Sequence, residues 1–207
     1  RIVGGLEPAS EGSVLVDGLP PAAARRAKRV GLVPQSPGLL PWRTVRANAR
    51  LLLDVNRSAT AKTLRTDVDE LLREVGLDAF ADAYPHELSG GMQQRVALVR
   101  AFALDAPLLL MDEPFAALDE MTREDMRHLL VSLCERTRAT VLFVTHSIAE
   151  ASFVSDRVVV MTSRPGRIHS IVPVGLPRPR RSGLEEDAAF FAVETQLRAA
   201  LRDGAGR

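Results

Sequence analysis

The stretch that decides the fold reads Leu88-Ser-Gly-Gly-Met-Gln-Gln-Arg-Val96, continues as Leu108-Leu-Leu-Met-Asp-Glu-Pro-Phe115 and closes with Ala117-Leu-Asp119. Its first part predicts the start of a helix. Ser89 offers a hydroxyl cap, Gly90 and Gly91 allow close approach to the backbone, and residues 92–104 follow at helical spacing. The backbone amides at such a start can face an anion.

The second part predicts a buried strand that ends in two carboxylates. After the break at Ala106-Pro107, residues 108–111 form a continuous apolar run, which is typical of a strand covered on both faces. Asp112 and Glu113 follow at once. In an open parallel sheet, ligands bind beyond the carboxyl ends of the strands. An aspartate there suits Mg²⁺, and a neighbouring glutamate can orient or deprotonate a water.

Each part has a plainer interpretation when it stands alone. Ser-Gly-Gly before a helix is usually only a cap and a turn, and Asp-Glu-Pro after a strand is more often a solvated turn. Here, however, His146 follows the next predicted strand. In this order and at this spacing, the features together resemble the signature motif, Walker B motif, D-loop and H-loop of the ABC ATPase family. The resemblance covers nearly all 207 residues and implies an α/β fold, a P-loop NTPase core with an inserted helical subdomain.

Composition restricts the class of protein. An apolar fraction of 46% over 207 residues is enough for a buried core. The net charge is +1 with the two signs interspersed, which gives no reason to expect nucleic acid as a partner. A single cysteine, Cys134, excludes an internal disulfide, and its leucine-rich surroundings indicate core packing. The sequence shows no apolar run near the roughly 20 residues that cross a bilayer.

The chain before the signature contains two predicted strands and a helical segment. Residues 1–8 look like the end of a helix terminated by glycine, so we expect the start of the domain to be missing. Strands are predicted at 13–16 and 29–34. Gln35 follows the second strand, and a proline-rich loop leads into a helix near Thr44. An apolar stripe closed by Gly76 predicts a further helix from Leu64, Val68, Leu71, Leu72 and Val75.

After the signature, helices and strands alternate. A helix is predicted after Asp119, to about residue 136, and a buried, β-branched strand at 140–144. Residues 147–153 are predicted to be helical. Strands are expected next at 157–162 and 168–172.

The C-terminal part reads as a linker and a helix. The basic stretch 177–181 is interpreted as a solvated linker. The last helix is predicted to open with three acidic residues, Glu185, Glu186 and Asp187, which suit the positive end of a helix dipole. We therefore assign residues 1–175 to the ATPase domain, with the helical subdomain at about 40–105, and residues 176–207 to the linker and helix.

The family resemblance implies that ATP is sandwiched between two such subunits. It places Ser89, Gly90 and Gly91 on the γ-phosphate of the nucleotide held by the partner subunit. Asp119 would then couple the two sites.

The same resemblance assigns the chemistry at the strand ends. Asp112 would hold Mg²⁺ through water, and Glu113 would act as the general base. Gln35 stands where the family has its Q-loop and would reach the Mg²⁺ and the attacking water. His146 would contact the γ-phosphate.

Partners also follow from the resemblance. Leu40, Pro41, Trp42 and Arg43 would line the groove that receives a transmembrane permease; the alternative for Trp42 is a buried anchor of the helical subdomain. The segments 156–168 and 176–180 are similar to the ATPase subunits of nitrate, sulfonate and taurine importers. The implied location is the cytoplasmic face of the bacterial inner membrane, with a substrate-binding protein as an indirect partner.

One family motif does not occur in these 207 residues. The sequence contains no Gly-x-x-x-x-Gly-Lys-Ser/Thr, and neither Lys28 nor Lys62 has the required glycines before it. That loop grips the phosphates, so the chain alone is not expected to hold ATP. An alternative is a truncated, non-catalytic subunit or a decayed-gene product that docks on the permease. An ABC ATPase acting on DNA or ribosomes is disfavoured, because the chain has neither a long coiled coil nor a duplicated cassette.

The same missing region bears on stability. In the family it includes a central strand of the sheet, so its loss would expose strand edges and apolar faces. We therefore expect the isolated chain to be poorly stable or to aggregate.

Overall fold

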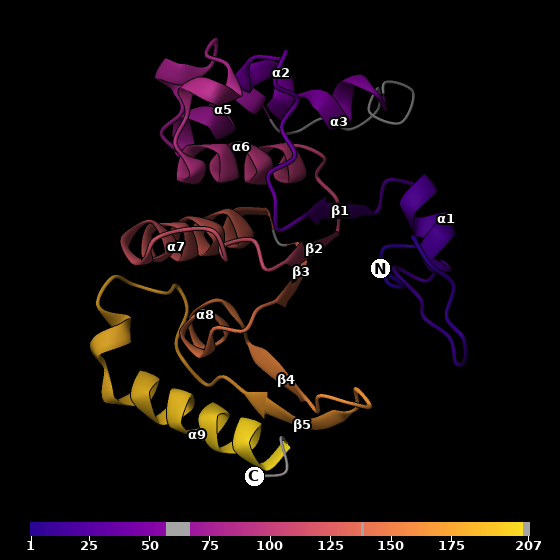
Figure 1. Ribbon diagram of the computed structural model, residues 1–207, viewed down its shortest axis with the longest axis vertical. Coiled ribbons are helices and arrows are strands. Elements are labelled where there is room, and N and C mark those ends of the chain that lie inside the picture. Colours follow the sequence, from indigo (N-terminus) through magenta and orange to yellow (C-terminus); the bar gives the residue numbers. More distant parts are fainter. Residues whose placement is uncertain (57–66, 138, 205–207) are drawn as a thin grey trace. The chain divides into compact units, whose positions relative to one another are not determined.

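The chain folds into two compact units in a computed structural model that describes residues 1–56, 67–137 and 139–204 (Figure 1). The first unit comprises Arg1–Met126 and Leu133–Val144. The second comprises Arg127–Ser132 and Thr145–Arg207. The long helix α7 (Glu120–Thr137) contributes residues to both units.

A parallel sheet forms the centre of the first unit. Its strands are β1 (Val30–Val33), β2 (Leu108–Asp112) and β3 (Thr140–Val144), in the order β1-β2-β3. In the register of the sheet, Val33 lies beside Met111 and Met111 beside Phe143. The predicted parallel sheet is confirmed, and all three carboxyl ends point to the same edge.

The two faces of this sheet differ in burial. Val33, Leu109 and Met111 lie on one face and are at most 1% exposed. On the other face Leu142 is 47% exposed. The prediction that β3 is a buried strand is therefore wrong. In the described part of the chain β3 pairs with β2 alone and so lies at an edge of the sheet. Its β-branched and apolar residues correctly predict a strand, but they do not predict whether other elements cover that strand.

Helices follow β1 in the first unit. They are α2 (Val45–Ala49), α3 (Leu51–Asp54), α5 (Val68–Glu74) and α6 (Gly90–Phe102), with short 3₁₀ turns at Asp78–Phe80 and Pro85–Glu87. α2, α5 and α6 pack against one another (Figure 1). The predicted apolar stripe is buried at Val68, Leu71, Leu72 and Val75, and Gly76 ends the helix at a φ of +70°. Leu64 lies outside the described residues.

The first six residues have the hydrogen bonding of a helix end. The Gly5 N–H donates to the Ile2 carbonyl at 2.9 Å, and the Leu6 N–H donates to the Arg1 carbonyl at 3.1 Å. Gly5 has a φ of +65°. This pair of bonds around a left-handed glycine is the Schellman motif that terminates α-helices, as the glycines predicted.

The strand predicted at 13–16 does not form. Only Val16 bridges to Leu19, across a two-residue turn in which Asp17 and Gly18 both have positive φ. Such a turn closes a hairpin tightly. Pro20 follows at once, and the helix α1 (Pro21–Arg26) begins there, which leaves no room for the pairing to continue.

The second unit is a hairpin and two helices. β4 (Arg157–Met161) and β5 (Ile168–Pro173) pair antiparallel, and α8 (Ile148–Val154) and α9 (Ala188–Gly204) complete the core. The last helix does not open with the acidic residues as predicted. Leu184–Glu186 forms a separate 3₁₀ turn, and Asp187 is extended. The Asp187 carbonyl accepts the first bond of α9, from the Phe190 N–H.

The basic stretch 177–181 is exposed except at Arg180, so the prediction of a solvated linker is wrong at that residue. Arg180 is 7% exposed. Its guanidinium donates to the carbonyls of Phe153 at 3.0 Å and Ser155 at 2.9 Å, and also to those of Leu176 and Pro177. The last carbonyls of a helix have no N–H partner within that helix. The guanidinium of Arg180 provides the hydrogen-bond donors for those at the end of α8.

Candidate functional site

The start of α6 is built as its sequence predicts. Ser89 is the N-cap, and its hydroxyl accepts the Met92 N–H at 3.3 Å. The helix begins at Gly90, two residues before the predicted Met92. Ser89 and Gly90 are exposed, whereas Gly91 is buried against Thr122 of α7. An anion could therefore approach the first amides of a 13-residue helix from the side of Ser89.

The two carboxylates lie where β2 ends. Asp112 is the last residue of the strand and is exposed. Glu113 is half-buried and has a φ of +45°, a left-handed conformation that costs a residue with a side chain roughly 1–2 kcal/mol. Its N–H donates to the Val144 carbonyl at 2.9 Å, so the pairing with β3 fixes the turn. Strain held in this way is typical of functional positions.

The turn after Glu113 is anchored in the core. Phe115 is fully buried, and its ring lies 5.6 Å from that of Phe143, measured between centroids. This contact ties the segment leading to Asp119 to the face of β3 that carries Phe143.

Asp119 caps α7. Its carboxylate accepts the Thr122 N–H at 3.0 Å and the Thr122 hydroxyl at 2.8 Å. The hydrogen bond from the Thr122 N–H, followed by that from the hydroxyl, lowers the pKa of the Asp119 carboxyl. Sequence reasoning missed this cap, although an aspartate directly before a predicted helix is a known signal for it.

Gln35 lies at the same sheet edge as the carboxylates. It follows the end of β1 by two residues and is exposed. Because Val33 pairs in register with Met111, Gln35 and Asp112 leave adjacent parallel strands in the same direction. Trp42, in the loop beyond Gln35, is 71% exposed, so its interpretation as a buried anchor is wrong.

His146 belongs to the second unit and is exposed. It follows the end of β3 by two residues, within a hydrogen-bonded turn. The Ser147 N–H donates to the Thr145 hydroxyl at 2.9 Å, and the Ser147 hydroxyl caps α8 by accepting the Glu150 N–H at 3.3 Å. The other seven predicted site residues all lie in the first unit.

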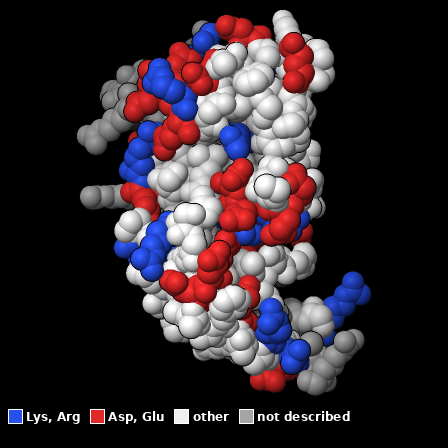
Figure 2. All heavy atoms as spheres, turned by 90° about the vertical axis from the view of Figure 1, so that its left-hand side faces the viewer, with Lys and Arg blue, Asp and Glu red and all other residues white. Residues whose placement is uncertain are grey.

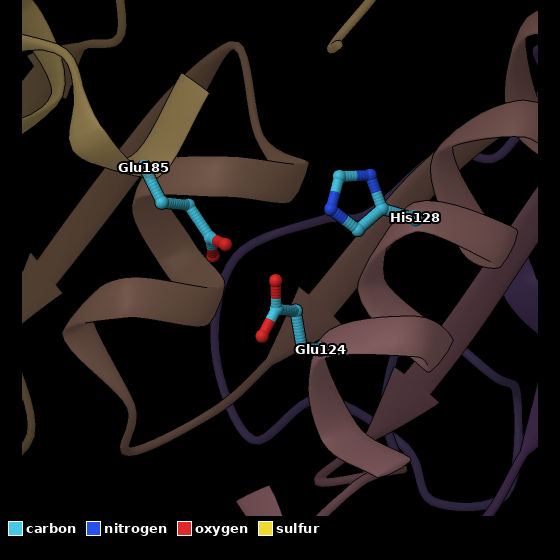
Figure 3. A group of neighbouring side chains, drawn as sticks. All are labelled: Glu124, His128 and Glu185. Carbon is cyan, nitrogen blue, oxygen red and sulfur yellow. The ribbon is translucent and has the colours of Figure 1, made fainter. Parts of the chain in front are cut away.

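Three further side chains, Glu124, His128 and Glu185, are of types that can bind a metal ion (Figure 3). Glu124 and His128 stand one turn apart on α7, and Glu185 comes from the 3₁₀ turn before α9. Glu185 forms an ion pair with Arg127 at 2.8 Å, and His128 packs edge-on against Phe153. Since Glu124 belongs to the first unit and the other two to the second, we assign no metal site to them.

On the face drawn in Figure 2, charged side chains of both signs are present, and basic side chains lie next to acidic ones. None of the helices in the described ranges has the length and apolar character needed to cross a membrane.

The family follows from comparison with known proteins. The family model described as ABC transporter matches residues 1–116. The chain belongs to the ABC transporter family. This ABC transporter chain is 47% identical to a taurine import ATP-binding protein of Rhizobium johnstonii, over 97% of this chain and 74% of that protein. It is 39% identical to an aliphatic sulfonates import ATP-binding protein of Bacillus cereus, over 87% of this chain and 69% of that protein.

A solved structure agrees with this assignment. A dimeric ATP-binding cassette in a post-hydrolysis state, bound to ADP and phosphate, shares 31% identity and superimposes with a TM-score of 0.65. The match covers 84% of the ABC transporter chain and 78% of that structure. The fold is therefore the α/β P-loop NTPase fold of ABC ATPases, as predicted.

Proposed function

We propose that the chain is the ATP-binding and ATP-hydrolysing subunit of an ABC importer for nitrate, sulfonate, taurine or a related small anion. One observation carries the proposal. Asp112 and the strained Glu113 leave β2 at the sheet edge where Gln35 also emerges. The similarity to taurine and sulfonate import subunits supports the class of cargo.

The residues at this edge suit Mg²⁺ and a nucleophilic water. Asp112 and Gln35 both offer exposed oxygen donors, the ligand type that Mg²⁺ prefers, and they would hold the ion. When bound, the ion supplies neutralisation of phosphate charge. Glu113 would accept the proton of the attacking water. The left-handed backbone of Glu113, held by the hydrogen bond to the Val144 carbonyl, would fix the direction in which the side chain leaves the backbone.

The remaining predicted residues would act on the phosphates. Ser89, Gly90 and Gly91 would bind the γ-phosphate of the nucleotide held by a second ATPase subunit, through the hydroxyl and the amides of α6. His146 would contact the γ-phosphate in its own subunit. Asp119 would link the two sites.

The partners of this proposal are a second ATPase subunit and a permease. The exposed indole of Trp42 would meet the permease. The chain would then lie peripherally on the cytoplasmic face of the membrane, with a substrate-binding protein as an indirect partner.

ATP turnover in the assembled transporter tests the proposal. We expect Glu113→Gln to lower hydrolysis by roughly 10²–10⁴-fold while labelled ATP still binds, because only proton transfer is lost. Glu120→Gln is the control, since Glu120 is an exposed carboxylate that pairs with Arg123 at 2.8 Å. Equal hydrolysis by both variants would overturn the role of Glu113.

The alternative is a subunit that docks on the permease without binding ATP. In that case the chain would copurify with the permease, but photolabelling with an ATP analogue would mark only the other subunit. Labelling of this chain would exclude the alternative.

A further inference from the structure

The loop between β1 and α2 is held from inside by a buried arginine. Arg100 of α6 is 8% exposed, and its guanidinium donates to the Gly38 carbonyl at 3.0 Å and also to the Pro37 carbonyl. Burial of this guanidinium is costly and lowers the pKa of Arg100. The two carbonyls recover part of that cost through hydrogen bonds to a charged donor.

The other half of the loop is held by a buried asparagine. Asn48 of α2 is fully buried, and its Oδ1 accepts the Leu40 N–H at 2.7 Å. Its Nδ2 lies within donor distance of the carbonyls of Leu40, Arg43 and Thr44, at 3.1, 2.9 and 3.1 Å. One amide side chain thereby ties together both ends of residues 40–44.

Trp42 stands between these bonded residues and yet is 71% exposed. Moving an indole out of water lowers the free energy. A flexible loop would therefore be expected to fold Trp42 back onto the protein. The bonds from Asn48 and Arg100 oppose that collapse. Since α2 packs on α6, the loop, α2 and α6 are joined through buried polar contacts.

We propose that Asn48 and Arg100 are positioning residues that make the loop 36–43 a rigid extension of α6, with Gln35 at its base and Trp42 at its tip. The α6 helix that begins at Ser89 then carries the exposed indole with it as one body. The use of this body rests on the proposed function, in which the exposed indole of Trp42 meets the permease. A preformed loop also loses less conformational entropy when it docks.

Trp42 itself reports on the loop, because it is the single tryptophan of the chain. We would measure its time-resolved fluorescence anisotropy in the full chain, with far-UV circular dichroism to verify folding. Asn48→Ala is expected to lower the residual anisotropy about twofold by releasing nanosecond loop motion. Arg100→Met is expected to lower it less, and Arg100→Lys least, because lysine keeps one charged donor but not the fork.

Two control variants remove comparable bonds elsewhere. Arg95, also on α6, donates to the Val75 carbonyl at 3.0 Å, and Asn56 donates to the Leu52 carbonyl at 2.6 Å. Arg95→Met and Asn56→Ala should leave the anisotropy of Trp42 unchanged. If Asn48→Ala and Arg100→Met also leave it unchanged, the proposal is wrong.

A measurement on the unaltered chain covers the case in which a variant does not fold. The Leu40 N–H is bonded to Asn48, and the Arg43 N–H to the Leu40 carbonyl at 3.1 Å. Both amides should exchange with deuterium at least about tenfold more slowly than unprotected amides. Exchange of both at the unprotected rate would overturn the proposal.

A measurement with added permease distinguishes a failure of this inference from a failure of the proposed function. Quenching of Trp42 by acrylamide should fall when the permease is added, if the loop docks there. A rigid loop whose quenching is unaffected would contradict the docking and leave the positioning roles intact. A mobile loop that becomes shielded would contradict the positioning roles alone.

Discussion

Gly91 faces Thr122 so closely that a β-carbon on Gly91 would lie 2.5 Å from the Thr122 methyl carbon, Cγ2. Non-bonded carbons do not approach to that distance, so only glycine fits there. The contact sets the first turn of α6 against the first turn of α7. It thereby joins the segment capped by Ser89 to the segment capped by Asp119.

Gly91→Ala should therefore destabilise the first unit. The added methyl has to displace α7, and such overpacking typically costs about 1–3 kcal/mol. Gly90→Ala is the matched control, because a β-carbon there meets nothing within 4 Å and alanine favours a helix. Urea unfolding measures both. Adding Thr122→Ser, which removes the methyl and keeps the hydroxyl, should restore much of the loss in Gly91→Ala; no recovery would mean that the clash lies elsewhere.

Asp119 should make stability depend on pH at the acid end. Its folded pKa is lowered by the Thr122 amide and hydroxyl, so its ionised form stabilises the fold above the unfolded pKa of about 3.9. That contribution is lost as the pH falls through the lower, folded pKa. The urea midpoint of Asp119→Asn should thus lie below that of the unaltered chain at pH 7, and the two should converge below about pH 4. A constant gap would show that ionisation of Asp119 is not the cause.

Arg180 should be far more sensitive to substitution than its neighbour Arg178. Arg180→Lys keeps the charge but cannot reach four carbonyls, and we expect a loss of about 2 kcal/mol. Arg178 is more exposed and pairs with Asp156 at 2.8 Å, so Arg178→Lys should cost less than about 1 kcal/mol. Chemical unfolding of the two variants compares them. If both variants lose the same free energy of unfolding, the hydrogen bonds of Arg180 do not stabilise the fold more than the ion pair of Arg178.

The exposed face of β3 should promote self-association. Leu142 is 47% exposed on a strand that pairs on one side only among the described residues. Leu142→Lys should reduce light scattering of concentrated protein and change the unfolding free energy by less than about 1 kcal/mol. Leu201→Lys on α9, where Leu201 is 42% exposed, tests whether any added charge suffices. Cooperative melting without association of the unaltered chain would refute the predicted self-association.

Features fixed by neighbours in the chain could be predicted. The cap at Ser89, the strand before Asp112, the stripe that buries Leu71 and the glycine end at Gly76 all follow from periodicity and local hydrogen bonding. The errors at residues 13–16 and at the start of α9 are also local. A tight turn replaces the predicted strand at 13–16, and a 3₁₀ turn followed by an extended Asp187 replaces the predicted start of the last helix.

The sequence by itself determined the order of elements, the parallel sheet and the identity of the residues at its carboxyl edge. Only the tertiary structure decided burial at positions where the local pattern is silent or misleading. It left β3 and Trp42 exposed, buried Arg180, and placed Arg100 on a carbonyl 62 residues away. At these positions burial depends on which distant segments pack beside the residue, and the pattern of a single helix or strand does not contain that information.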